Sequence, residues 1–218
     1  IALTLGTGAV RYIAEPGPWR YSVHGLDVSH HRGEINWDRV PGKYRFVYIK
    51  STEGANFRDR FFRRNWREAC RRGMLTGAYH FFTFCKSGAA QARNYIRTVP
   101  KETDSLPPAV DLENSGNCNR RPSVRSFRRE LKVFTQRLEQ HYGKRPVLYL
   151  TKWFWQDYGQ GLEDQYDIWM SDVTAEPDYV PAWKFWQHSI RGSVPGVNGE
   201  TDLNVFRGSL RDLRRFAG

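Results

Sequence analysis

The sequence lacks the short motifs that mark several common enzyme classes. It has only three cysteines and two methionines in 218 residues. There is no Cys-x-x-Cys pair and no cysteine–histidine spacing typical of zinc. The nucleophile elbow Gly-x-Ser-x-Gly, the Walker phosphate loop and the dinucleotide fingerprint Gly-x-Gly-x-x-Gly are absent as well. Hydrolases with that serine elbow, P-loop nucleotidases and Rossmann dehydrogenases are therefore excluded, and we expect neither a cofactor nor a metal.

The three cysteines are Cys70, Cys85 and Cys118. One disulfide is compatible with this number, and at least one thiol is then left over. Cys70 lies in a helical pattern with no evident histidine partner, which argues against a thiol nucleophile. The cysteines alone decide neither the pairing nor the cellular compartment.

Long apolar runs are also missing. The segment IALTLGTGAV at 1–10 is small and apolar, but it is too short to span a bilayer. We interpret it as the remnant of a signal peptide or membrane anchor; the alternative is an ordinary extension. Residues 1–23 are thus expected to be an N-terminal extension, and 24–218 a single domain.

Basic residues outnumber acidic ones, with 34 Lys and Arg against 23 Asp and Glu, for a net charge of +11. Such a charge attracts polyanions. The basic residues are spread along helical segments and form no single tail, which is typical of solvated helix faces. We therefore expect no specific nucleic-acid partner.

Short apolar runs alternate with longer helical patterns along the chain. The expected strands are 25–29, 45–52, 76–82, 108–113, 145–151, 166–171, 182–189 and 201–206. The expected helices are 57–73, 87–98, 123–142 and 209–216. This alternation predicts βα units and a mainly parallel sheet. Because little helical sequence follows the later strands, we predict an irregular TIM-like α/β barrel whose helices are reduced in the C-terminal third.

Polar side chains gather where these strands end, which is where barrels of this kind hold their active sites. The acidic members are Asp27, Asp111, Glu113 and Asp202. The other residues at these strand ends include Lys50, Tyr79, Tyr149, Trp186 and Gln187.

Asp111 and Glu113 in the segment PAVDLE are two residues apart, so on a strand their side chains share a face. Their Cα atoms would be about 6.5 Å apart. Like charges at that spacing raise one pKa, which leaves one acid protonated. A protonated acid beside an ionised one suits glycosidic bond cleavage. The alternative is a structural pair neutralised by Lys50 or an arginine.

The histidines suggest a rival metal site, in which His24, His30, His31 and His80 join Asp27. His30 and His31 are adjacent, however, and would point to opposite faces of a strand. We interpret His80 as a packed or hydrogen-bonded residue and His31 as a rim residue.

Taken together, these motifs resemble glycoside hydrolase family 25, the Chalaropsis-type lysozymes or N-acetylmuramidases. The resemblance covers residues 24–207 and rests on seven blocks: HGLDVSHHRGEINW at 24–37, FVYIKSTEG at 46–54, NWREACRRG at 65–73, GAYHFF at 77–82, PAVDLE at 108–113, VLYL at 147–150 and WQHS with VPGVNGETDLNVF within 186–206.

The resemblance implies hydrolysis, with net retention, of the β-1,4 bond between N-acetylmuramic acid and N-acetylglucosamine in peptidoglycan. It implies that Glu113 is the proton donor and that Asp111 orients or stabilises the intermediate, either a covalent ester or an oxazoline. Asp27 and Asp202 would line the cleft floor. Tyr79, Tyr149, Trp186 and Gln187 match positions that would contact sugar, and Lys50 joins them as a candidate for binding substrate. Arg32 and Asn36 depart from the family's usual Gln and Asp, which affects rim contacts and substrate preference.

A wall-degrading enzyme of this kind would be exported, as a secreted, periplasmic or anchored protein facing the cell wall. Peptidoglycan strands are the expected partner, and anionic wall polymers would be attracted by the basic surface. Membrane contact is expected only through an anchor near the N-terminus. The alternative, from a different class, is a noncatalytic peptidoglycan-binding module that keeps the cleft.

Overall fold

The computed structural model describes residues 20–218, so most of the expected N-terminal extension lies outside the described residues. Its strands are β1 (Val23–Val28), β2 (Tyr44–Glu53), β3 (Phe57–Arg58), β4 (Leu75–Phe81), β5 (Ala109–Leu112), β6 (Val147–Thr151), β7 (Ile168–Ser171), β8 (Trp183–Gly192) and β9 (Thr201–Phe206). Its α-helices are α1 (Phe62–Arg71), α2 (Gly88–Ile96), α3 (Val124–Tyr142), α4 (Lys152–Phe154) and α5 (Leu210–Ala217).

Eight of the strands close into a barrel, in the order β1-β9-β8-β7-β6-β5-β4-β2, and β1 pairs with β2 to complete the ring. The barrel strands pair in parallel except for β9, which runs antiparallel to both β8 and β1. The short β3 adds to β2 outside the ring. The predicted mainly parallel α/β barrel is therefore confirmed.

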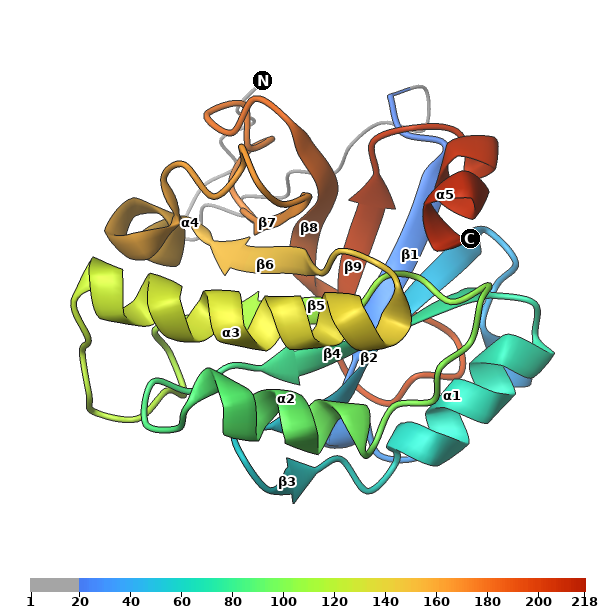
Figure 1. The fold of residues 1–218 in the computed structure, drawn as a ribbon. Helices are drawn as coiled ribbons and strands as arrows, with labels where there is room; N and C mark the ends of the chain where they lie inside the picture. The colour runs from blue at the N-terminus through green and yellow to red at the C-terminus, as the bar shows by residue number, and fades with distance from the viewer. Residues whose placement is uncertain (1–19) are drawn as a thin grey trace, which may run out of the picture.

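The helices cover the barrel unevenly. In Figure 1, α1, α2 and α3 pack against the outside of the first half of the barrel, whereas the later strands are joined mostly by loops. Between β6 and β7 lie only the three residues of α4 and a short π-helix at Trp155–Gly159, and no helix separates β7, β8 and β9. The expected thinning of helices in the last third is confirmed.

Local sequence explains where the helices begin and end. Ser123 caps α3 by accepting the amide hydrogen bond of Ser126, and Gly143 ends the helix with a φ of 73°. The helix expected over 57–73 is shorter than its pattern, because Phe57 and Arg58 pair with β2 and the helix begins at Phe62.

Two apolar layers result from the alternation of side chains along each strand. The outer layer fills the space between the barrel and its helices. The inner layer includes Phe46, Tyr48, Trp169 and Phe185, and the rings of Tyr48 and Trp169 stack with centroids 4.9 Å apart. These rings form an apolar floor inside the barrel, and the polar residues of the site lie beside it.

Candidate active site

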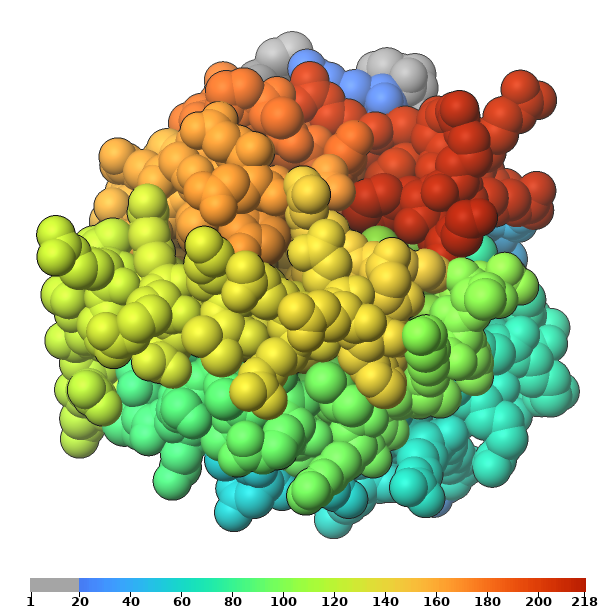
Figure 2. Space-filling model, viewed as in Figure 1, coloured from blue at the N-terminus to red at the C-terminus, as the bar shows by residue number. Residues whose placement is uncertain are grey.

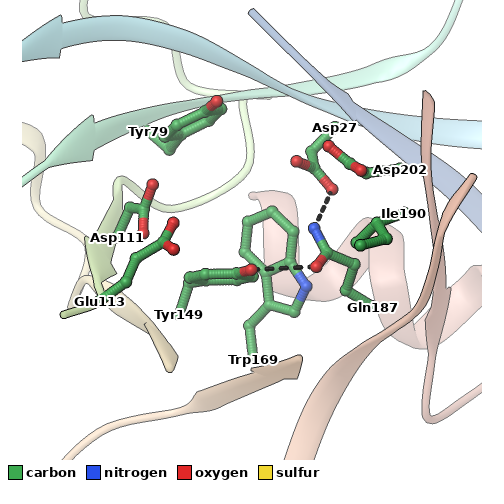
Figure 3. A pocket seen from close by; sticks show the side chains of 9 residues that line it. All are labelled: Asp27, Tyr79, Asp111, Glu113, Tyr149, Trp169, Gln187, Ile190 and Asp202. Atoms are coloured by element: carbon green, nitrogen blue, oxygen red, sulfur yellow. Dashed lines mark hydrogen bonds between the residues drawn. The ribbon is translucent and has the colours of Figure 1, made fainter. Parts of the chain in front are cut away.

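A cavity of about 220 Å³ occupies the interior of the barrel at the end where the parallel strands finish. Its lining residues are Asp27, Tyr79, Asp111, Glu113, Tyr149, Trp169, Gln187, Ile190 and Asp202. Figure 3 shows Asp111 and Glu113 on one side and Asp27 and Asp202 on the other, with the rings of Tyr149 and Trp169 between them. The four carboxyl groups expected from the sequence thus converge on one cavity.

The first acid pair comes from β5 and the residue just beyond it. The side chains of Asp111 and Glu113 lie next to each other on one face, as their two-residue spacing predicts (Figure 3). Burial raises the pKa of both groups, and the charge of Glu113 raises that of Asp111 further. A hydrogen bond between the carboxyl groups raises the pKa of Asp111 and lowers that of Glu113, so the pair retains one proton with Asp111 as its holder.

The two acids differ in burial, since Asp111 is buried and Glu113 is only half-buried. Burial penalises the charged form, and the penalty is larger at the deeper site. Burial and the neighbouring charge therefore favour the protonated form at Asp111 more strongly than at Glu113.

The second acid pair is formed across two antiparallel strands. Asp27 of β1 lies directly opposite Asp202 of β9. Like charges in that position repel. Burial and the charge of Asp27 raise the pKa of Asp202 to about 9, so Asp202 is protonated at neutral pH and hydrogen-bonds to Asp27.

A directed set of hydrogen bonds identifies Asp27 as the ionised member. Gln187 Nε2 and Asn204 Nδ2 donate to Asp27 Oδ2 at 2.9 and 2.7 Å. The Gln187 amide is oriented by Tyr149, whose hydroxyl donates to Gln187 Oε1 at 2.9 Å. The Asn204 amide is oriented by Trp169, whose indole N–H donates to Asn204 Oδ1 at 2.8 Å. Each donor in this set of hydrogen bonds thus favours a negative charge on Asp27.

Asp202 reaches the site in an unexpected way. The sequence placed it at the end of a strand, but it is the second residue of β9. Since β9 runs antiparallel to its neighbours, its first residues lie at the end of the barrel where the parallel strands finish. The strand direction, not the strand end, brings this acid into the cavity.

Glu113 lies one residue beyond β5, so the loop after the strand determines where its backbone sits. The side chain of Asn117 fixes that loop. Its Nδ2 donates to the carbonyl oxygens of Glu113 and Phe82 at 3.1 and 2.9 Å, and its Oδ1 accepts from the amides of Phe84 and Cys118 at 2.9 and 3.0 Å. A disulfide between Cys85 and Cys118 ties the same two loops together.

Two candidate substrate residues do not line the cavity. The indole of Trp186 packs in the outer apolar layer and donates to the carbonyl of Asp172 at 2.7 Å, so the expectation that Trp186 contacts substrate is corrected. The reason is the alternation of side chains: Gln187 faces the interior, so its neighbour faces outward. Lys50 Nζ forms an ion pair with Glu53 at 2.8 Å, and its positive charge lowers the pKa of Asp111 and of Glu113.

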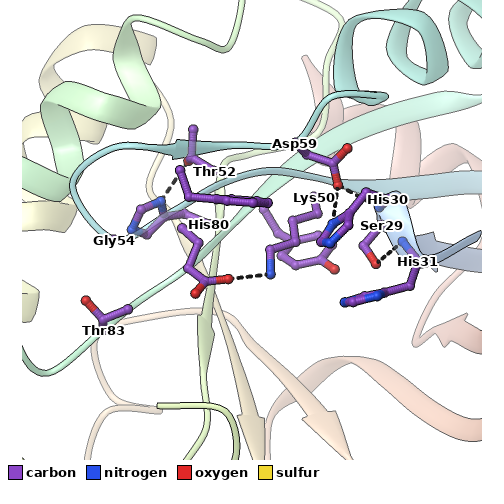
Figure 4. A network of polar contacts seen from close by, with 12 residues as sticks. Ser29, His30, His31, Lys50, Thr52, Gly54, Asp59, His80 and Thr83 are labelled. Atoms are coloured by element: carbon purple, nitrogen blue, oxygen red, sulfur yellow. Dashed lines mark hydrogen bonds and ion pairs between the residues drawn. The ribbon is translucent and has the colours of Figure 1, made fainter. Parts of the chain in front are cut away.

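The histidines form separate local contacts (Figure 4). His30 bonds to Asp59 through its backbone amide and Nδ1, and buried His80 bonds to Thr52 at 2.7 Å and to Gln91 at 3.1 Å. Burial lowers the pKa of His80 to about 3. Within residues 20–218, no cluster of three or more His, Cys, Asp or Glu side chains has a geometry that could hold a metal ion.

Sequence reasoning missed four residues of the site or its support: Trp169, Ile190, Asn204 and Asn117. Asn204 could have been found, since it lies two residues after Asp202 on the same strand and shares its face. Trp169 could have been found as a large residue inside a predicted barrel strand. Nothing in the sequence marks Asn117, whose partners are set by the meeting of two loops.

Comparison with known proteins then decides the family. Residues 26–197 match the sequence model of Glycosyl hydrolases family 25. The chain belongs to this family. It is 35% identical to the uncharacterized protein YegX of Escherichia coli (strain K12), over 91% of this chain and 75% of that protein. It is 33% identical to Lysozyme M1 of Streptomyces globisporus, over 89% of this chain and 71% of that protein.

Solved structures agree with the sequence comparison. A family 25 glycosyl hydrolase from Bacillus anthracis superposes with a TM-score of 0.89 at 34% identity, covering 97% of this chain and all of that one. A bacterial lysozyme from Streptomyces coelicolor superposes with a TM-score of 0.81 at 34% identity, covering 90% of this chain and 97% of that one. The barrel of this family 25 hydrolase is therefore that of a glycoside hydrolase.

Proposed function

We propose that this family 25 hydrolase is a lysozyme that cleaves the β-1,4 bond between N-acetylmuramic acid and N-acetylglucosamine in peptidoglycan. The observation that carries the proposal is the convergence of four carboxyl groups in one cavity, with one member of each pair ionised and the other protonated. Glycosidic cleavage needs a proton for the leaving oxygen and a negative charge near the sugar carbon that becomes positive.

In the proposed mechanism, the first pair meets both needs by transferring its shared proton. As the glycosidic oxygen approaches Glu113, the proton moves from Asp111 to Glu113 and on to the leaving oxygen. The same movement leaves Asp111 ionised, where it stabilises the positive charge developing on the substrate. The intermediate is either an ester or an oxazoline formed by the substrate's own N-acetyl group. Glu113 then accepts a proton from the attacking water, which restores the pair and gives net retention.

The second pair would hold the sugar. Asp27 keeps its negative charge under two amide donors and can accept hydrogen bonds from sugar hydroxyls, while Asp202 supplies a proton to the pair. Burial and the four nearby carboxyl groups raise the pKa of Tyr79, so its hydroxyl stays protonated and can donate to substrate. Tyr149 and Trp169 offer ring faces and edges on which a pyranose can pack.

An exported location fits both the substrate and the chain. The Cys85–Cys118 disulfide is typical of proteins that mature in an oxidising compartment. The described residues 20–218 include no helix long and apolar enough to cross a bilayer. We propose that the enzyme acts outside the cytoplasm on the cell wall.

Purified cell walls provide the direct test. The wild-type protein should release fragments with new reducing ends on muramic acid. The variant Glu113→Gln should fold normally and lose about a thousandfold or more in kcat, because Gln cannot donate the proton. Glu139→Gln, the same change at an exposed position of α3, is the control and should keep full activity. Intact glycan after incubation with wild-type protein from pH 4 to 8 would refute the proposal, and an active Glu113→Gln variant would show that the acid is another residue.

A further inference from the structure

A second cavity, of about 160 Å³, opens beside the loop that carries Glu113. It lies between the start of α2 and the start of α3. Three aromatic rings contribute to its wall, those of Phe82, Phe84 and Phe127, all buried in the outer apolar layer. Its charged lining residues are Lys86, Arg120, Arg129 and Glu130.

Two of the three cations at this cavity lack an acidic partner. The carboxylate of Glu130 is occupied, since Oε2 accepts the amide of Gly88 at 3.0 Å and Oε1 pairs with Arg129 at 3.4 Å. Among the residues of the described chain, no acid forms an ion pair with Lys86 or Arg120. The cavity therefore presents uncompensated positive charge above an apolar wall, which suits a small anionic group.

The positive charge extends beyond the cavity itself. Residues 119–137 contain seven Lys and Arg and a single acid, a net +6 out of the chain's +11. This segment, the loop before α3 and most of α3, lies across the face seen in Figure 2, in lime and yellow-green. The surrounding field is therefore also positive and draws anions toward the cavity.

The two cavities have opposite charge and are linked through one side chain. The first is lined by four carboxyl groups and no Lys or Arg, whereas the second is lined by three cations. Asn117 joins them, because its amide bonds both the carbonyl of Glu113 and the backbone of Phe84, which lines the second cavity. A substrate with a neutral part and an anionic part would place its neutral part in the first cavity and its anionic part in the second.

We propose that the cavity beside Lys86 and Arg120 binds a carboxylate of the peptide stem attached to muramic acid. This inference rests on the proposed lysozyme function. In peptidoglycan the sugars are uncharged, and the carboxylates belong to the peptide that branches from the lactyl group of muramic acid. The two ionised carboxyl groups of the first cavity repel those carboxylates. A cationic cavity one loop away gives the stem a place to bind while its sugar occupies the active site.

The experiment compares glycan strands that carry stem peptides with the same strands after an amidase has removed the peptides. Wall phosphate polymers are first extracted from both. The variant to test is Lys86→Gln with Arg120→Gln. The matched control is Lys132→Gln with Arg137→Gln, which removes the same charge from exposed positions of α3 outside the cavity.

The double variant should lose about tenfold in kcat/KM on peptide-bearing strands, through KM, the scale of one hydrogen bond to a charged group. On peptide-free strands it should match the wild type within about twofold, as should the control variant on both substrates. Equal losses on the two substrates, or no loss on peptide-bearing strands, would overturn the inference.

Two further results are distinguishable from these. A loss that appears only on walls that keep their phosphate polymers would assign the cavity to those polymers and overturn the stem assignment. Wild-type protein that cleaves neither kind of strand would contradict the lysozyme function itself. Co-sedimentation with the two kinds of strand then tests the cavity separately, and binding that does not depend on the peptide would refute it.

Discussion

The acid pair across β1 and β9 has a cost in stability that one substitution should remove. Asp202 has a native pKa of about 9 against an ordinary value of 3.8. Between those pH values the folded protein holds a proton at this site that the unfolded chain releases. The contribution of this site to stability is therefore most favourable below about pH 4 and is lost as the pH rises through this window, with the full loss above about pH 9. The variant Asp202→Asn carries no such proton and should escape this loss.

The size of the effect follows from the shift. At pH 7, about three pH units of it apply, at about 1.4 kcal/mol each, which sets an upper limit of about 4 kcal/mol. The limit is not reached, because Asp202 is only partly buried and Asp27 interacts with the same proton. An asparagine can still donate a hydrogen bond to Asp27. We expect Asp202→Asn to be more stable than the wild type by about 2 kcal/mol at pH 7, and to lose most of its turnover.

Urea unfolding followed by circular dichroism measures this directly. The free energies of unfolding of wild type and variant should agree within about 0.5 kcal/mol at pH 4 and differ by about 2 kcal/mol at pH 7 and by more at pH 8.5. Asp164→Asn, the same change at an exposed position, should show no such pH dependence. A difference between wild type and Asp202→Asn that is the same at pH 4 and pH 8.5 would refute the reasoning.

Two more predictions concern the support of the site. Asn117→Ala should reduce kcat at least about tenfold with little change in KM and should move the pH optimum, because Glu113 loses the amide that fixes its loop. Asn117→Asp, which keeps the two acceptor contacts, should recover part of the rate. An unchanged pH profile in Asn117→Ala would contradict the positioning role. Gly88→Ala should lower the unfolding free energy by about 2 kcal/mol or more, because a Cβ there would lie 1.9 Å from the carbonyl oxygen of Glu130. Gly42→Ala, which meets nothing within 4 Å, is the control, and equal stability of the two variants would disprove the close approach.

Much of the fold was predictable because the barrel depends on regular patterns. Each predicted strand is present, and the loss of helices late in the chain was visible as missing helical sequence. The acids were predictable because strands of one direction finish at one end of a barrel. The position of Trp186 was wrong for a reason that the same pattern contains, since a residue next to an inward-facing Gln187 faces outward.

Other features depend on contacts that no local pattern encodes. The pairing of Cys85 with Cys118 requires two loops to meet, and so do the four hydrogen bonds of Asn117. The position of the shared proton depends on the relative burial of Asp111 and Glu113, which differ although they are two residues apart. The cationic cavity brings Lys86 and Arg120 together across 34 residues of sequence, so its charge is visible only in three dimensions.

The reversed direction of β9 has a consequence for how the enzyme matures. Asp27 stands near the start of the barrel, but its partner Asp202 and its donor Asn204 are among the last barrel residues to be synthesised. Until β9 inserts between β8 and β1, the ring is open and Asp27 has no facing acid. A nascent chain, or one truncated before β9, therefore lacks the assembled acid pair. For an enzyme that attacks cell walls, this order of assembly means that hydrolysis has to wait until β9 is in place.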